Sequence, residues 1–239
     1  MSRLLIAHGS PDPRHREVMQ RLAIATEQRS GQSTCVAYLD HDQPNVDEAL
    51  STAANGPAAE HVDALGLFLS DGYHARVDVP AALAAFADQG TVSDHGTLGM
   101  GPWLIPALER ELLAVGVDVH SQATGVVLVA AGSSRPEARE GVVRVASHWQ
   151  RERGGPVRPA FASGPGPSLD EALAMLTDAG CSERSIALLM LAPGVLADRV
   201  VEAAAVHSVP ITEPIATASE VIDRIIARTV TQHAGDHGL

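Results

Sequence analysis

PNVDEAL at residues 44–50 returns as PSLDEAL at residues 167–173, with five of seven residues identical at a spacing of 123 positions. The same spacing places HGSPDP, residues 8–13, opposite AGSSRP, residues 131–136. Chance would give roughly one identity in ten or fewer at average composition. Similarity within a chain at a fixed spacing indicates a repeated structural unit. The sequence therefore predicts one unit that is written twice.

Both halves alternate short apolar runs with longer amphipathic ones. Strands are expected at residues 3–7, 34–39, 63–69, about 91–98, 125–130, 156–162, 185–191 and 210–212. Helices are expected at residues 14–29, 46–54, about 76–88, 102–115, 135–150, 168–178, 197–206 and 217–231. Apolar strands that are separated by helices are typical of a mainly parallel sheet.

This pattern predicts an α/β fold of two similar lobes, residues 1–118 and 122–239. Each lobe is expected to contain a mainly parallel four-stranded sheet flanked by helices. Two similar lobes should meet along a pseudo-twofold axis, and we expect an active-site cleft between them.

Composition excludes several classes of protein. The net charge is −12, whereas a protein that binds nucleic acid normally has a basic surface. No apolar run approaches the ~20 residues that a membrane-spanning helix needs, and the first apolar run is too short for a signal peptide. The two cysteines lack a CxxC spacing, so no disulfide framework or zinc knuckle is indicated. We expect a cytoplasmic protein without nucleic-acid or membrane partners, and two fused lobes are compatible with a functional monomer.

Three polar residues of the first half follow consecutive predicted strands. His8 ends the first strand, Asp40 ends the second, and His74 lies just past the third. Ligands of open α/β sheets bind beyond the carboxyl ends of the strands, so the fold should gather these residues at one edge. Two imidazoles and a carboxylate suit a divalent metal such as Fe, Co, Ni or Zn, and they also suit proton transfer near neutral pH.

The second half serves as an internal control for this interpretation. Ala131 stands opposite His8, Ser163 opposite Asp40 and, after a slip of one residue, Leu196 opposite His74. If the histidines only served packing, similar groups would be expected in both halves. The comparison favours a functional role, and the alternative that these are partly exposed loop residues stays open.

The serine and glycine motifs have structural explanations. Ser10 or Asp12 is expected to cap the first helix, although the turn around Ser10 also suits an anion. Gly99-Met100-Gly101 is a weak phosphate-loop candidate that is better explained as a turn before Pro102. His41 adjoins Asp40 and is a candidate for supporting a metal ligand.

The sequence resembles the class II chelatases of tetrapyrrole synthesis, and most closely the sirohydrochlorin chelatases that insert cobalt or iron. The resemblance rests on His8-Gly9-Ser10 after a strand, Tyr38-Leu39-Asp40 with Pro44, the segment GYHARVDVP at residues 72–80, and Leu98-Gly99 before a helix. It covers the first half, and the second half fits as the degenerate repeat of long, two-lobed members.

The resemblance implies ATP-independent insertion of Co²⁺ or Fe²⁺, with Ni²⁺ also compatible, into sirohydrochlorin for cobalamin or siroheme synthesis. No organic cofactor is implied. The family's histidine pair carries over to His8 and His74 as catalytic and metal-binding residues. Its acidic partner is usually glutamate, and Asp40 at that place is one methylene shorter. Asp40 therefore either binds metal, directly or through water, or orients a histidine.

A polycarboxylate substrate and a net charge of −12 require a local cationic rim. Arg14, Arg76, Arg135 and Arg139 are candidates, and we expect Ser10, Arg14 and Arg76 to contact the tetrapyrrole. Arg76 is favoured because it follows His74 by two residues, although a solvated helix arginine is an equally simple explanation.

Three other functions are weighed against this one. A ferrochelatase that acts on another porphyrin would need an aromatic, membrane-facing lip, and aromatic residues make up only 3% of the chain. A non-catalytic carrier of metal or tetrapyrrole would bind without turnover. A Ser/His/Asp hydrolase is disfavoured because the sequence contains no GxSxG motif.

Overall fold

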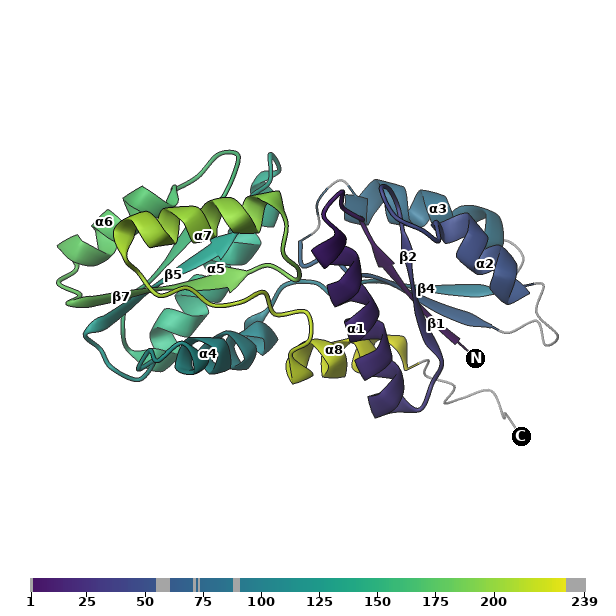
Figure 1. The fold of residues 1–239 in the computed structure, drawn as a ribbon, viewed down its shortest axis with the longest axis horizontal. Helices are drawn as coiled ribbons and strands as arrows, with labels where there is room; N and C mark the ends of the chain where they lie inside the picture. Colours follow the sequence, from purple (N-terminus) through teal and green to yellow (C-terminus); the bar gives the residue numbers. More distant parts are fainter. Residues whose placement is uncertain (1, 55–60, 71, 73, 88–90, 231–239) are drawn as a thin grey trace, which may run out of the picture. The chain divides into compact units, whose positions relative to one another are not determined.

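A computed structural model describes residues 2–54, 61–70, 72, 74–87 and 91–230. The first lobe contains a four-stranded parallel sheet in the order β2-β1-β3-β4 (Figure 1). Its strands are β1 (Ser2–Ala7), β2 (Thr34–Tyr38), β3 (Val62–Gly66) and β4 (Val92–Thr97). The predicted α/β class and the parallel arrangement of this lobe are confirmed.

The second sheet is parallel and has the order β6-β5-β7, which repeats the order of the first three strands. Its strands are β5 (Thr124–Ala130), β6 (Val157–Phe161) and β7 (Glu183–Leu189). The prediction of four strands in this lobe was wrong for the described residues. The segment predicted as a strand at 210–212 makes only an isolated parallel bridge, between Ile211 and Ile186.

Helices occupy the segments that the amphipathic pattern predicted. They are α1 (Pro13–Ser30), α2 (Val46–Ala54), α3 (Val79–Ala87), α4 (Ile105–Ala114), α5 (Pro136–Arg153), α6 (Leu169–Asp178), α7 (Val195–His207) and α8 (Ser219–Thr229). Two short turns precede two of them, the π-helical η1 (His74–Asp78) before α3 and the 3₁₀-helical η2 (Pro102–Leu104) before α4. None of the described helices is long and apolar enough to cross a membrane.

The spacing of 123 positions recurs in the structure. Helix pairs α1/α5 and α2/α6 and strand pair β2/β6 begin 123 positions apart. In the first lobe, Leu4 and Ile6 of β1 belong to one buried cluster with Val46 and Leu50 of α2. The residues 123 positions later form the corresponding cluster of the second lobe, namely Val127, Val129, Leu169 and Leu173. The duplication is therefore a repeat of core contacts as well as of sequence.

Reciprocal caps explain why the repeated PxxDEAL segments start helices. The Asn45 side chain accepts the backbone N–H of Glu48 at 2.9 Å, and the Glu48 carboxylate accepts the backbone N–H of Asn45 at 3.2 Å. Ser168 and Glu171 form the same capping box before α6. Such caps satisfy N–H groups that have no partner inside the helix.

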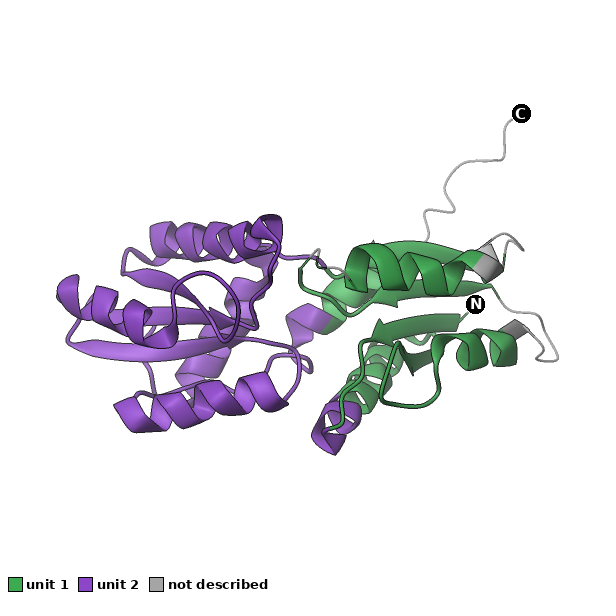
Figure 2. Cartoon of the chain, turned by 90° about the horizontal axis from the view of Figure 1, so that it is seen from above, with its two compact units in different colours: residues 1–11, 19–98, 222–239 green, residues 12–18, 99–221 purple. Residues whose placement is uncertain are grey.

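The chain forms two compact units that are not sequential halves (Figure 2). One unit comprises residues 1–11, 19–98 and 222–239, and the other comprises residues 12–18 and 99–221. Most of α8 therefore belongs with the first sheet, while α4 packs against β7 of the second. The lobes predicted at 1–118 and 122–239 describe the sequence repeat and stay a prediction.

A buried polar network fixes α8 to the first sheet. Arg3, which is 1% exposed, donates from Nε to the Thr229 hydroxyl at 2.7 Å and from Nη2 to the Gln32 side chain at 2.8 Å. Gln32 in turn contacts the buried Asp63 carboxylate, which also meets His95 at 2.8 Å. Burial lowers the pKa of Arg3 and the charge of Asp63 raises it, so this pairing compensates part of the cost of a buried cation.

Candidate metal-handling site

His8 is placed by the loop that follows β1. Its half-buried ring donates from Nδ1 to the carbonyl oxygen of Gly9 at 3.0 Å. Gly9 has φ +92°, and a Cβ there would lie 1.7 Å from the backbone oxygen of Asp40. The backbone N–H of Asp40 donates to the carbonyl of His8 at 2.8 Å. A glycine is therefore needed to bring the loops after β1 and β2 together beside His8.

His74 begins the π-helical turn η1 at the end of the loop that follows β3. π-Helical turns are rare and often occur at functional sites. The His74 side chain is 48% exposed, and its Nδ1 lies 2.5 Å from Oδ2 of Asp78, four residues further along the turn. Because an ionised carboxylate can only accept a hydrogen bond, this contact places a proton on Nδ1 of His74.

The two predicted histidines come together at the carboxyl edge of the sheet. Their ring centroids are 4.3 Å apart, and the rings meet edge to face at 71°. The ring of Phe68 lies 6.4 Å from that of His74 at an interplanar angle of 23°. In both histidines the Nδ1 proton points to a protein oxygen, so each neutral ring carries its lone pair on Nε2. A neutral imidazole with a free lone pair on one ring nitrogen is the form that binds metal ions.

Asp40 contacts the neighbouring histidine, His41, in the loop that follows β2. Its Oδ1 accepts the backbone N–H of His41 at 2.8 Å, and its Oδ2 lies 3.5 Å from Nε2 of the same residue. His41 adopts φ +65°, a left-handed conformation that is uncommon for a residue other than glycine. Its ring centroid is 6.1 Å from that of His8. The loop after β2 thus brings the pair Asp40–His41 to the edge of the sheet that carries His8.

The sequence left open which of Ser10 and Asp12 caps α1 and whether the turn around Ser10 binds an anion. The Asp12 side chain accepts the backbone N–H of Arg14 at 2.9 Å and caps α1. The Ser10 backbone N–H donates to the Asp42 carboxylate at 3.2 Å, so this loop is also tied to the loop after β2. A contact of Ser10 with the tetrapyrrole stays a prediction.

The two arginines expected at the substrate have different surroundings. Arg14 pairs with Asp12 and, at 2.6 Å, with Asp198 of α7, and these carboxylates raise the pKa of Arg14 above its ordinary value. Their charges offset that of Arg14, so it offers little net attraction to an anion. Arg76 lies in the same π-helical turn as His74 and is exposed. Its role in binding stays a prediction.

Within the described ranges, no three or more His, Cys, Asp or Glu side chains are grouped so as to hold a metal ion. The described residues thus bring together a pair of imidazoles, those of His8 and His74. Sequence reasoning missed Asp78 and Asp42 as its supports. The spacing of four residues between His74 and Asp78 is a signal for the first, since such residues meet on a helical turn. No comparable signal marks Asp42, whose contact crosses between two loops.

The equivalent edge of the second sheet keeps the turn and lacks the imidazoles. Gly132 has φ +98°, and a Cβ there would lie 1.9 Å from the backbone oxygen of Ser163. The Ser163 hydroxyl donates to the carbonyl of Ala131 at 2.8 Å. The backbone geometry of the duplicated unit is thus retained, while Ala131, Ser163 and Leu196 supply no strong metal ligand.

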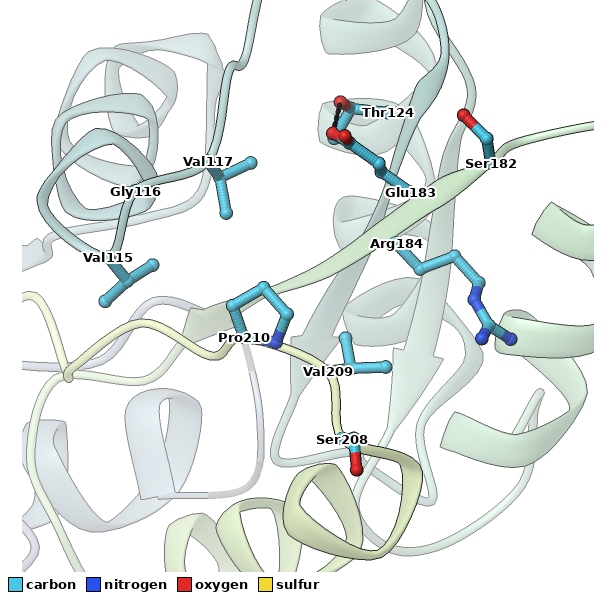
Figure 3. Close-up of a pocket in the computed structure, with 10 residues that line it drawn as sticks. All are labelled: Val115, Gly116, Val117, Thr124, Ser182, Glu183, Arg184, Ser208, Val209 and Pro210. Carbon is cyan, nitrogen blue, oxygen red and sulfur yellow. Dashed lines mark hydrogen bonds between the residues drawn. The ribbon is translucent and has the colours of Figure 1, made fainter.

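A hollow of about 380 Å³ lies at the opposite edge of the second sheet, beside the first residues of β5 and β7 (Figure 3). Thr124, Glu183 and Arg184 line it together with the residues that follow α4 and α7. Its lining includes none of the residues predicted to act on substrate. Because ligands of open α/β sheets bind at the carboxyl edge, this hollow is not the candidate site.

Comparison with known proteins agrees with the resemblance. The model of the CbiX family matches residues 2–114 and again residues 125–232, so each half of the chain matches it separately. A sirohydrochlorin cobaltochelatase of Methanothermobacter thermautotrophicus is 28% identical over 92 residues, which are 38% of this chain. The match spans 62% of the length of that relative.

Two solved structures share the fold over nearly the whole chain. SirB from Bacillus subtilis with Fe³⁺ has a TM-score of 0.77 at 21% identity, and the match covers 95% of this chain and 94% of that one. The sirohydrochlorin chelatase SirB from Bacillus subtilis subspecies spizizenii in complex with cobalt has a TM-score of 0.70 at 18% identity, covering 96% and 94%. At these identities the matches establish a common chelatase-like fold.

Proposed function

The chain belongs to the CbiX family, and we propose that it is a metal chelatase that inserts Co²⁺ or Fe²⁺ into sirohydrochlorin. The observation that carries the proposal is the contact between His8 and His74, whose rings lie 4.3 Å apart. Residues from two separate loops meet there, in the lobe where the sequence predicted a site. The relatives named above support the substrate and the metals.

The reaction requires groups that exchange protons and bind metal weakly. A free macrocycle must lose two pyrrole N–H protons, and a hydrated metal ion must lose water. Neutral imidazoles suit both tasks, because Nε2 is a metal ligand and a proton acceptor near neutral pH. Two ligands in an open arrangement also allow release of the ion to the macrocycle, which a closed four-ligand site would resist.

The imidazole pair alone does not determine which metal ion is inserted. Nitrogen ligands bind Fe²⁺, Co²⁺ and Ni²⁺ in rising order of affinity, and availability in the cell often decides which ion is used. We propose Co²⁺ and Fe²⁺ as physiological substrates, with Ni²⁺ accepted in vitro and no organic cofactor taking part. The cytoplasmic location, the lack of nucleic-acid and membrane partners and a functional monomer stay predictions.

Recognition of a polycarboxylate by a chain of net charge −12 requires local cations. We assign this role to Arg76, because it is exposed and shares the turn of His74. Ser10 is assigned a hydrogen bond to the substrate from the loop beside His8. Arg14 would contribute only if the substrate displaced Asp12 or Asp198.

An anaerobic insertion assay tests the proposal. Purified protein is mixed with sirohydrochlorin or protoporphyrin and with Co²⁺, Fe²⁺ or Ni²⁺, and insertion is followed by absorbance against the uncatalysed rate. We expect multiple turnovers with sirohydrochlorin and none with protoporphyrin. Stoichiometric binding without turnover would identify a carrier, and turnover only with protoporphyrin would identify a ferrochelatase; either result would contradict the proposal.

A further inference from the structure

The carboxylate contact of His74 uses a different ring nitrogen from the carboxylate contacts of His41, His95, His148 and His207. A carboxylate lies at Nε2 of the histidine in the pairs His41–Asp40, His95–Asp63, His148–Glu152 and His207–Asp170. At His74 the carboxylate of Asp78 meets Nδ1 instead, at 2.5 Å. The contact of His8 with Gly9 also uses Nδ1. The two histidines of the candidate site are thus held through the same nitrogen.

This geometry has a chemical consequence for His74. A carboxylate that accepts the Nδ1 proton selects the tautomer with its lone pair on Nε2. We propose that Asp78 is a positioning residue that fixes the tautomer and ring orientation of His74 for metal binding. The inference deepens the proposed function and rests on it.

Other contacts of His74 agree with a ring that is held in one orientation. Phe68 lies nearly parallel to the ring, and His8 meets it edge to face. Asp78 adds the directional contact that neither ring supplies. Because the pair lies within one turn of η1, the backbone already brings the two side chains together, and little additional order is needed to form the contact.

A contribution to the free energy of folding does not account for the contact between His74 and Asp78. The side chains of His74 and Asp78 are 48% and 33% exposed, and exposed pairs of this kind contribute little to the free energy of folding. Carboxylates that hold metal-binding histidines have a larger effect on the metal, since their loss typically weakens affinity or activity roughly 10- to 100-fold. The two explanations therefore predict different results for the same substitution.

Three substitutions separate the parts of the interaction. Asp78→Ala removes the acceptor, Asp78→Asn keeps an oxygen acceptor without the charge, and Asp78→Glu keeps the charge on a longer arm. The apparent affinity of each full-length variant for Co²⁺ alone is measured by visible absorbance, and kcat/KM for Co²⁺ is measured with saturating sirohydrochlorin. We expect Asp78→Ala to lose roughly 10- to 100-fold in both. Asp78→Asn should lose less of both quantities than Asp78→Ala. The KM for sirohydrochlorin should be unchanged in these variants.

Glu152→Gln is the matched control, because His148 and Glu152 form a histidine–carboxylate pair with the same spacing on α5. Glu152→Gln should change neither the Co²⁺ affinity nor kcat/KM for Co²⁺.

Wild-type Co²⁺ affinity in folded Asp78→Ala would overturn the inference. Equal losses in Asp78→Asn and Asp78→Ala would show that the uncharged oxygen acceptor contributes nothing to holding His74. If Asp78→Ala fails to fold, Asp78→Asn decides by the same measurements. A wild-type protein that binds Co²⁺ without inserting it would contradict the proposed function and leave the affinity test of Asp78 intact.

Discussion

At the scale of single residues, the two lobes share their turn glycines and differ in their reactive groups. Gly9 and Gly132 have nearly the same positive φ and the same close approach to a neighbouring loop. His8 and His74 could be predicted as functional residues, because the second lobe keeps the same fold without histidines at the equivalent positions. Asp78 was overlooked although its spacing of four residues from His74 predicts a contact on a helical turn; which ring nitrogen it meets is visible only in the structure.

The two glycines provide a residue-scale prediction. Gly9→Ala and Gly132→Ala each place a methyl group within 2 Å of a backbone oxygen at a positive φ, so each should lower the free energy of unfolding by roughly 2–4 kcal/mol. Urea unfolding measures this loss. Gly9→Ala should also reduce insertion per folded molecule, because the displaced loop adjoins His8.

Gly132→Ala is the control for activity, since its loop carries no histidine. Its insertion rate per folded molecule should stay near that of the wild type at a temperature where both proteins are folded. Equal loss of activity in the two variants would show that the turn of the second lobe takes part in the reaction.

At the scale of elements, the helices were predicted well. Their amphipathic pattern and the residues that cap them are both local features of the sequence. The bounds of α2, Val46–Ala54, match the prediction, and the capping box of Asn45 and Glu48 explains why. The strand predicted at 210–212 failed because pairing depends on a neighbour, and only Ile211 meets β7. The π-helical turn at His74 also went unpredicted, because an element of five residues, His74–Asp78, is too short to show a hydrophobic period of its own.

Helices α4 and α8 give an element-scale prediction for acid stability. Arg110 donates two hydrogen bonds of 2.7 Å to Glu220, and this pairing lowers the pKa of Glu220 from its ordinary value near 4.5 to about 2. Because the folded-state pKa is depressed, the contribution to stability is complete above about pH 4.5 and is lost as the pH falls toward 2. Arg110→Gln should cost up to about 1 kcal/mol at pH 7 and almost nothing near pH 2.

Urea unfolding at a series of pH values measures that difference. Arg144→Gln is the matched control, because Arg144 lies 3.7 Å from Glu140 and both side chains are highly exposed. It should change stability little at any pH. A loss in Arg110→Gln that persists undiminished near pH 2 would contradict the assigned origin.

At the scale of the whole molecule, the chain returns to its first sheet after completing the second. Residues 222–229 belong to the first compact unit although they follow the whole second sheet in sequence. The amphipathic pattern predicted the helix α8 without indicating its partner. Arg3 and Asp63 of the first sheet are buried polar residues whose partners, Thr229 and His95, are far away in sequence. Such long-range pairing cannot be derived from local patterns.

Thr229→Val tests this closure of the fold. The change keeps the shape of the side chain and removes the oxygen that accepts from the buried Arg3 guanidinium, so it should cost about 1.5–3 kcal/mol of unfolding free energy. Thr52→Val on α2 is the control, because its exposed hydroxyl makes only the local bond to the carbonyl of Glu48. Equal urea midpoints for the two variants would show that α8 is not held through Arg3.

Metal handling by His8 and His74 is tested by the initial rate of Co²⁺ insertion into sirohydrochlorin. The variants His8→Ala and His74→Ala are each compared with the wild type at equal concentrations of folded protein. The contact between the two rings is the basis for assigning both to metal handling. Each substitution should reduce the rate by roughly a hundredfold or more, since each removes a metal ligand and a proton acceptor. Wild-type rates in both variants would contradict the assignment.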